Sequence, residues 1–220
     1  GQSGAVRPLT AVLKTGASAA ASHAATALAK INGRSARSAL KNRHATATGA
    51  LQADIERALI EAGLTDRKLA ATLALSGQSP AIRTAAFAQL TTLDRKAATK
   101  VLQTALTDPA TARRDVLIKA AIASQLRDQV ISQLATLSPA DQAVALGAIA
   151  DQHLTATEAD VLALLASAAE AQKPLIIRTL GVIGSDQSYG PLYALYLTDN
   201  RDRTVADALA RLKAPSADKT

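Results

Sequence analysis

Leucines that return about every 30 residues constrain the fold of this chain more than any other feature. Several of them stand in a small-Leu-small-x-aliphatic pattern, and the positions are Leu28, Leu59, Leu90, Leu146, Leu180 and Leu209, with Leu117 or Ile122 filling the gap. A period of this length is typical of repeats that contain one pair of helices. A single pair cannot cover both of its apolar faces, so neighbouring pairs must stack. The pattern predicts an all-α protein, an α-solenoid of about six stacked antiparallel helix pairs.

The segments between these leucines predict the second helix of each pair. They carry aliphatic side chains three and four residues apart, which form one apolar stripe on a helix: Val101, Leu102 and Leu106, then Val130, Ile131 and Leu134, then Val161, Leu162 and Leu165. The chain contains 52 Ala and 30 Leu against one Phe, three Tyr and no Trp. Ala and Leu favour helices, and closely packed thin layers need few large side chains, so the composition disfavours a β-sandwich or a β-barrel.

Capping residues mark where the helices begin. Four dipeptides place a capping side chain beside a proline or a polar residue: Ser79-Pro80, Asp108-Pro109, Ser138-Pro139 and Asp199-Asn200. Such residues accept hydrogen bonds from the free backbone N–H groups of the first turn. We therefore expect a helix to start at each of these positions.

The C-terminal part of the chain resembles the HEAT-type repeat family, in particular the short bacterial HEAT-like repeats found in phycobilin lyases and many scaffold proteins. The resemblance rests on residues 180–186, followed by Tyr189, residues 191–192 and residues 197–199, while Arg83 and Arg113 resemble the family's basic residue early in the first helix. It extends over residues 5–212. It implies a stack of helix pairs but no particular activity, because the motifs specify architecture.

The resemblance and the periodicity together predict a single HEAT-like array over residues 1–214 and a disordered tail over residues 215–220. The array begins with a second helix at residues 6–13 and ends with a first helix at residues 204–212. Solenoids need polar terminal repeats for solubility, and neither end shows one. We therefore expect this array to be a segment of a longer protein or to be flanked by another domain.

Charge is distributed unevenly along the chain. Residues 1–53 hold seven basic and no acidic residues, whereas the remainder holds 18 of each sign. Lys30, Arg34, Arg37 and Lys41 would share one face if that stretch were a continuous helix, and Arg43 follows them. One interpretation is a solvated helix face, and the other is a surface that binds an acidic partner or phosphates.

Tyr189, Tyr193 and Tyr196 recur at helical spacing on one predicted second helix and are the only tyrosines of the chain. An aromatic stripe of this kind packs against the next repeat in most helical proteins. Tyr is also a favoured anchor of protein interfaces, so interface aromatics are the alternative.

The sequence offers no support for catalysis or for a cofactor. The three histidines are scattered and the chain has no Cys, so we expect neither a metal site nor any other cofactor. The glycine-rich phosphate loop and the nucleophile elbow are missing, as are the paired His-Glu motifs of the HEAT-type hydroxylase. No apolar run reaches the roughly 20 residues of a membrane span.

These observations predict a non-catalytic scaffold that presents a solenoid surface to a protein partner or a flanking domain. A first alternative is binding of nucleic acid or another anionic surface through the basic N-terminal quarter, for which HEAT-like DNA glycosylases give a precedent. A second is a structural arm of a multidomain bacterial protein. Abundant Ala, Thr, Ser and Gln with four Glu favour a periplasmic or exported bacterial location over the cytoplasm.

Overall fold

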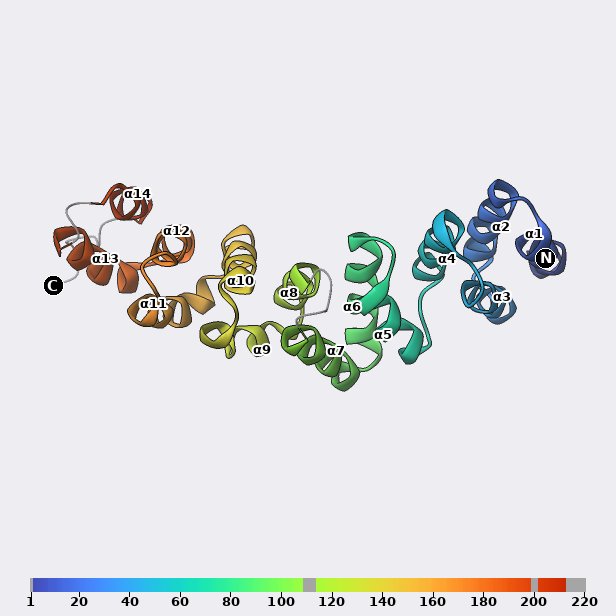
Figure 1. The fold of residues 1–220 in the computed structure, drawn as a ribbon, viewed down its shortest axis with the longest axis horizontal. Coiled ribbons are helices and arrows are strands. Elements are labelled where there is room, and N and C mark those ends of the chain that lie inside the picture. The colour runs from blue at the N-terminus through green and yellow to red at the C-terminus, as the bar shows by residue number, and fades with distance from the viewer. Residues whose placement is uncertain (1, 109–113, 199–201, 213–220) are drawn as a thin grey trace. The chain divides into compact units, whose positions relative to one another are not determined.

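The structure, a computed structural model, describes residues 2–108, 114–198 and 202–212, and it is all-helical in that part of the chain, without strands. The described residues form fourteen α-helices (Figure 1) and three short 3-10 helices. The α-helices are α1 Val6–Thr15, α2 Ser18–Ile31, α3 Arg34–His44, α4 Gly49–Glu61, α5 Arg67–Ser76, α6 Pro80–Leu93, α7 Arg95–Thr107, α8 Arg114–Ile122, α9 Arg127–Ile131, α10 Pro139–Asp151, α11 Glu158–Ser167, α12 Lys173–Ile183, α13 Asp186–Thr198 and α14 Arg203–Arg211. Many helices that are neighbours in the chain pack against each other, among them α1/α2, α3/α4, α5/α6, α11/α12 and α13/α14.

The helices gather into two compact units, Gly1–Ala120 and Ala121–Thr220. In the first unit, each helix packs against its neighbour in the chain from α1 to α4 and from α5 to α7. Even-numbered helices also pack on even-numbered ones, α2 on α4 and α4 on α6, and odd-numbered helices pack on odd-numbered ones, α1 on α3 and α5 on α7. The first unit therefore has an even-numbered layer and an odd-numbered layer.

The second unit repeats this arrangement. Here α12 packs between α10 and α14, α11 packs on α13, and the chain neighbours α11/α12 and α13/α14 join the two layers. Gly181 of α12 makes the closest approach, because a Cβ built on it would lie 2.9 Å from the Cα of Ala208 in α14. The absence of a side chain at position 181 thus allows α12 and α14 to touch along their backbones.

The repeating leucines form the core. Six of the predicted positions are buried, and each lies on an even-numbered helix: Leu28, Leu59, Leu90, Leu117, Leu146 and Leu180. Leu209 departs from the series, since it is half-buried while Val205, Ala208 and Leu212 are buried beside it. The apolar stripe of α14 is therefore rotated relative to the predicted register.

Two of the four predicted helix starts lie in the described residues and are confirmed. Ser79 accepts a hydrogen bond from the backbone N of Ile82 at 3.2 Å, and α6 begins at the following proline. Ser138 accepts from the backbone N of Asp141 at 3.2 Å, and α10 begins likewise. The predicted starts at Asp108-Pro109 and Asp199-Asn200 fall wholly or partly outside the described residues, as do Arg113 and the predicted tail.

Arg83, the basic residue of the HEAT resemblance, is buried in α6. Its Nε donates to the carbonyl oxygen of Gly77 at 2.8 Å, so it fastens the turn that precedes its own helix. This contact gives Arg83 a structural role within the first unit.

In each unit, a buried glutamate of one helix accepts hydrogen bonds from the start of the next helix in the same layer. In the first, Glu56 of α4 accepts from the backbone N of Gln78 at 2.8 Å, just before α6. In the second, Glu158 of α11 accepts from the backbone N of Ser185 at 2.7 Å and from the hydroxyl of Ser188 at 2.6 Å, at the start of α13. Burial raises the pKa of Glu158, but the hydrogen bonds from Ser188 and Ser185 outweigh it and hold that pKa below its usual value.

Candidate functional site

The predicted basic stripe is divided by a break in the backbone. Asn32 adopts a left-handed conformation with φ of 49° and ends α2, and α3 begins two residues later. Lys30 therefore belongs to α2, whereas Arg34, Arg37, Lys41 and Arg43 belong to α3. The expectation that Lys30 shares a helix face with the others was wrong, because an Asn-Gly pair leaves the helical conformation easily.

Three of the five predicted basic residues bind other parts of the first unit. The Nζ of Lys41 pairs with the carboxylate of Asp66, whose pKa is lowered by that hydrogen bond and by the backbone of Leu69. Arg37 donates to the carbonyl oxygen of Ala62 at 3.4 Å. Arg43 donates from Nε to the carbonyl oxygen of Leu13 at 3.2 Å and from Nη1 to the hydroxyl of Thr46 at 3.0 Å. These side chains connect helices of the first unit to one another.

The ion pair of Lys41 with Asp66 is the first of two similar pairs between odd-numbered helices, and the sequence analysis did not predict either of them. Asp66 caps α5 through the backbone N of Lys68 at 2.9 Å, and Asp94 caps α7 through that of Ala97 at 3.0 Å. Each acid also pairs with a cation from the preceding odd-numbered helix, Lys41 for Asp66 and Arg67 for Asp94, the latter at 2.9 Å. The signal in the sequence is the Asp-Arg-Lys triplet at residues 66–68 and again at residues 94–96.

A groove of about 570 Å³ between α1 and α3, which we call the basic groove, contains three cations that lack such partners. Arg7 and Lys14 line it from α1 and Arg34 lines it from α3. All three are exposed, and none has a hydrogen bond or an ion pair to another described residue. The rest of the lining is uncharged: Val6, Thr10, Ser35, Ser38, Ala39 and Asn42. Three positive charges therefore face one groove whose described lining holds no acid.

The basic groove continues along α3. Arg34 and Ser38 also line a second groove, of about 470 Å³, together with Arg37, Lys41 and Asp66. The two grooves thus adjoin on the same helix. Of the predicted residues, the structure brings Arg34, Arg37 and Lys41 to this surface, while Lys30 and Arg43 line neither groove.

The predicted tyrosines share α13. The rings of Tyr189 and Tyr193 are stacked with centroids 6.1 Å apart and planes inclined by 8°. Tyr193 is 47% exposed, and Tyr189 and Tyr196 are half-buried. Packing against a neighbour and presentation to a partner both remain predictions for this stripe.

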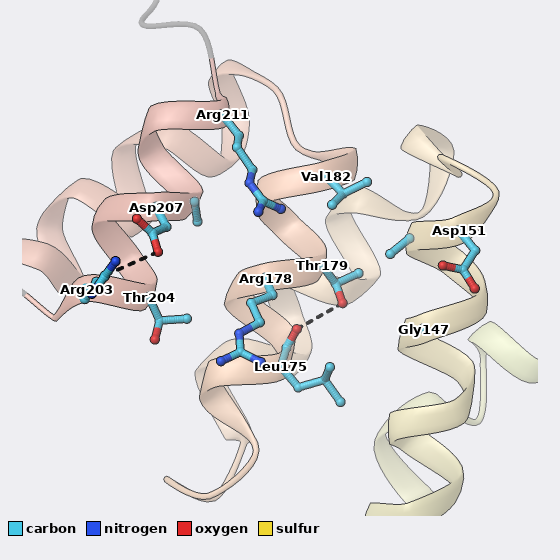
Figure 2. A pocket seen from close by; sticks show the side chains of 12 residues that line it. Gly147, Asp151, Leu175, Arg178, Thr179, Val182, Arg203, Thr204, Asp207 and Arg211 are labelled. Atoms are coloured by element: carbon cyan, nitrogen blue, oxygen red, sulfur yellow. Dashed lines mark hydrogen bonds and ion pairs between the residues drawn. The ribbon is translucent and has the colours of Figure 1, made fainter.

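A third groove, in the second unit, has no counterpart in the sequence predictions. It measures about 460 Å³ and is lined by α10, α12 and α14. Three arginines reach it, Arg178 from α12 and both Arg203 and Arg211 from α14 (Figure 2). We call it the arginine groove. Arg203 and Arg211 are eight residues apart and so share a face of α14, but nothing in the sequence places Arg178 beside them.

No family model, curated protein or solved structure matches this chain. The family and the function are therefore argued from the residues themselves.

The histidines do not form a metal site in the described part of the chain. His44 lies 3.2 Å from Glu56, between its Nε2 and the Oε1 of the carboxylate, and is held in the first unit by that contact. No three potential metal-binding side chains come together among the described residues. Among those same residues, no helix combines the length and the hydrophobicity that crossing a membrane requires.

Proposed function

We propose that the chain is a non-catalytic interaction module built as a HEAT-type α-solenoid, and that its basic groove binds an acidic segment of a protein partner. The layered packing within each unit supports the architecture, because first helices contact first helices and second helices contact second helices. Such a stack exposes long helix faces, which are the surfaces that repeat proteins use for binding.

Solution scattering tests the architecture separately from the binding. A compact domain of 220 residues has a radius of gyration of about 17 Å. A row of stacked helix pairs is longer, so we expect a clearly larger value that does not depend on concentration. A value near 17 Å would mean that the helices surround a common core, and the solenoid would have to be abandoned.

The single observation that carries the binding proposal is the set of unneutralised cations in the basic groove. Arg7 and Lys14 are seven residues apart on α1, which places them on one face about 10 Å apart along the helix axis. Arg34 faces them from α3. Three cations held on two packed helices attract a segment that carries several negative charges, since each exposed pair contributes up to about 1 kcal/mol.

Nucleic acid is the second candidate, because phosphates would satisfy the same cations. Proteins that bind single strands also stack bases on aromatic side chains. The described lining of the basic groove contains no aromatic residue, and Phe87, the one aromatic of the first unit, is fully buried. Acidic protein is therefore the better fit.

The experiment compares two triple variants of equal charge. In the first, Arg7→Gln, Lys14→Gln and Arg34→Gln remove the cations of the basic groove. In the second, Lys68→Gln, Lys96→Gln and Lys100→Gln remove three exposed lysines of α5 and α7 that have no partner among the described residues. The probes are fluorescent poly-L-glutamate and an oligothymidylate with the same number of charges.

We expect the wild-type chain to bind poly-L-glutamate in a salt-dependent way and the groove variant to bind about 3- to 100-fold more weakly, from three lost pairs of about 0.2–1 kcal/mol each. The lysine variant should bind almost as the wild type does. Equal losses in both variants would show that binding follows net charge, which contradicts the proposal. Tighter binding of the oligothymidylate would instead establish the nucleic-acid alternative.

A further inference from the structure

The arginine groove of the second unit is distinct from the basic groove and is built from different chemistry. Of the four arginines described between residues 121 and 220, three line it, and no lysine does. The guanidinium group is a planar fork that donates two parallel hydrogen bonds to a carboxylate or a phosphate. A groove whose basic residues are all arginines is therefore suited to an oxyanion.

Two of these arginines make no polar interaction within the described structure. Arg178 and Arg211 are exposed and make no hydrogen bond or ion pair with another described residue. Their side chains extend from α12 and α14 toward the space between those helices (Figure 2). Arg203 differs, because its Nε lies 4.0 Å from the carboxylate of Asp207 one turn along α14. The free guanidinium groups thus come from two different helices.

The walls that carry them are fixed relative to each other. Gly181 lies against Ala208 with no room for a Cβ, so α12 and α14 are in backbone contact beside the groove. Thr179, at the edge of the same lining, donates its hydroxyl to the carbonyl oxygen of Leu175 at 3.0 Å and stays within its own helix. Thr204, at the start of α14, also lines the groove, and its hydroxyl is hydrogen-bonded to the carboxylate of Asp202, the residue that caps the helix.

Two acidic side chains also belong to the groove and set its polarity. Asp207 is engaged by Arg203, and Asp151 lies on the α10 wall (Figure 2). The positive side is therefore the one between α12 and α14. An anion placed there would meet Arg178 and Arg211, while Asp151 would repel it weakly from the opposite wall.

We propose that the arginine groove binds a phosphomonoester group between Arg178 and Arg211. A phosphomonoester dianion offers three terminal oxygens and two negative charges to two guanidinium forks, one oxygen and one charge more than a single carboxylate. Clusters of arginines are a recurrent means of recognising phosphorylated segments. A volume of about 460 Å³ accommodates a phosphorylated side chain or a small phosphate ester.

The test measures binding of the full chain to three probes by calorimetry at physiological salt. The probes are a short peptide with one phosphoserine, the same peptide unphosphorylated, and phenyl phosphate. The variants are Arg178→Gln and Arg211→Gln, with Lys119→Gln as the control, because Lys119 is an exposed cation of α8 outside the groove. Asp151→Asn removes the opposing charge.

We expect binding that requires the phosphate and weakens about tenfold or more in each arginine variant, as the loss of a charge-assisted hydrogen bond predicts. Lys119→Gln should leave the affinity unchanged, and Asp151→Asn should strengthen it about two- to fivefold. Tighter binding of the peptide than of phenyl phosphate would identify a phosphorylated protein as the source, and the reverse order a small ester.

Three results would overturn the proposal: equal affinity for both peptides without binding of phenyl phosphate, wild-type affinity in both arginine variants, or weaker binding in Asp151→Asn. Far-UV circular dichroism and melting of each variant verify that the fold is retained, and the opposite sign expected for Asp151→Asn separates the site from general destabilisation. The triple variant of the basic groove should bind these probes as the wild type does. The proposals for the two grooves are therefore tested independently of each other.

Discussion

Replacement of Gly181 by alanine tests the packing of α12 on α14 most directly. A Cβ at this position would lie 2.9 Å from the Cα and 3.0 Å from the Cβ of Ala208. Carbon atoms normally approach to about 3.5–4.0 Å, and one of the two atoms belongs to the backbone, so rotating a side chain cannot relieve the clash. Forcing a methyl group into such a contact costs about 1–3 kcal/mol.

Gly147 of α10 supplies a matched control. It also stands inside a helix and beside the arginine groove, but a Cβ built there meets no atom within 4 Å. Alanine is favoured over glycine in a helix by about 1 kcal/mol. Gly147→Ala should therefore stabilise the protein by about that amount. Gly181→Ala has the same gain in helix propensity, but the clash with Ala208 opposes it. The free energy of unfolding of Gly181→Ala should therefore be about 1–3 kcal/mol lower than that of Gly147→Ala.

Urea unfolding followed by far-UV circular dichroism measures the difference, with the slope compared between variants to detect a partly unfolded intermediate. The difference between the two variants is informative because the helix propensity cancels. If Gly181→Ala raised the free energy of unfolding as much as Gly147→Ala does, α12 and α14 would not be in backbone contact, and the geometry of the arginine groove would lose its support.

Two further predictions concern acidic residues. Glu158→Gln should destabilise the protein by about 1–3 kcal/mol, because a charged acceptor of several hydrogen bonds becomes a neutral amide. The pKa of Glu158 is lower in the folded than in the unfolded chain, so its contribution is present above the ordinary value of 4.5 and is lost as the pH falls through the lower folded value. Thermal melts from neutral to acidic pH should accordingly show a shallower loss of stability in the variant than in the wild type, and parallel curves would contradict this account. Lys41→Gln should cost less than about 1 kcal/mol, since the ion pair with Asp66 is exposed, whereas Asp66→Ala should cost more because it also removes the cap of α5. Equal melting temperatures for these two variants would show that the cap contributes nothing.

Features that depend on residues close together in the chain could be predicted from the sequence. The helices follow from the spacing of aliphatic residues at three and four positions, and the burial of Leu28, Leu90 and Leu180 follows from their place on those stripes. The starts of α6 and α10 follow from Ser79 and Ser138, which bond to backbone groups three residues ahead. The Asp-Arg-Lys triplets were equally visible and would have located the starts of α5 and α7.

Which basic side chains form ion pairs could not be predicted in this way. Lys41 and Arg34 are both basic residues of α3, yet Lys41 forms an ion pair with Asp66, whereas Arg34 forms none with a described residue. Which of them is neutralised depends on where the start of α5, capped by Asp66, lies relative to α3. A left-handed residue at Asn32 likewise decides that Lys30 leaves the group.

The sequence by itself determined that this chain is helical, where α5, α6, α7 and α10 begin, and that most of the repeating leucines enter the core, because periodicity and capping act over a few residues along the chain. The tertiary structure alone decided that Arg178 and Arg211, 33 positions apart, would extend toward one space. Their meeting depends on the approach of Gly181 to Ala208, and the distance between two packed helices is set by contacts that no local pattern encodes.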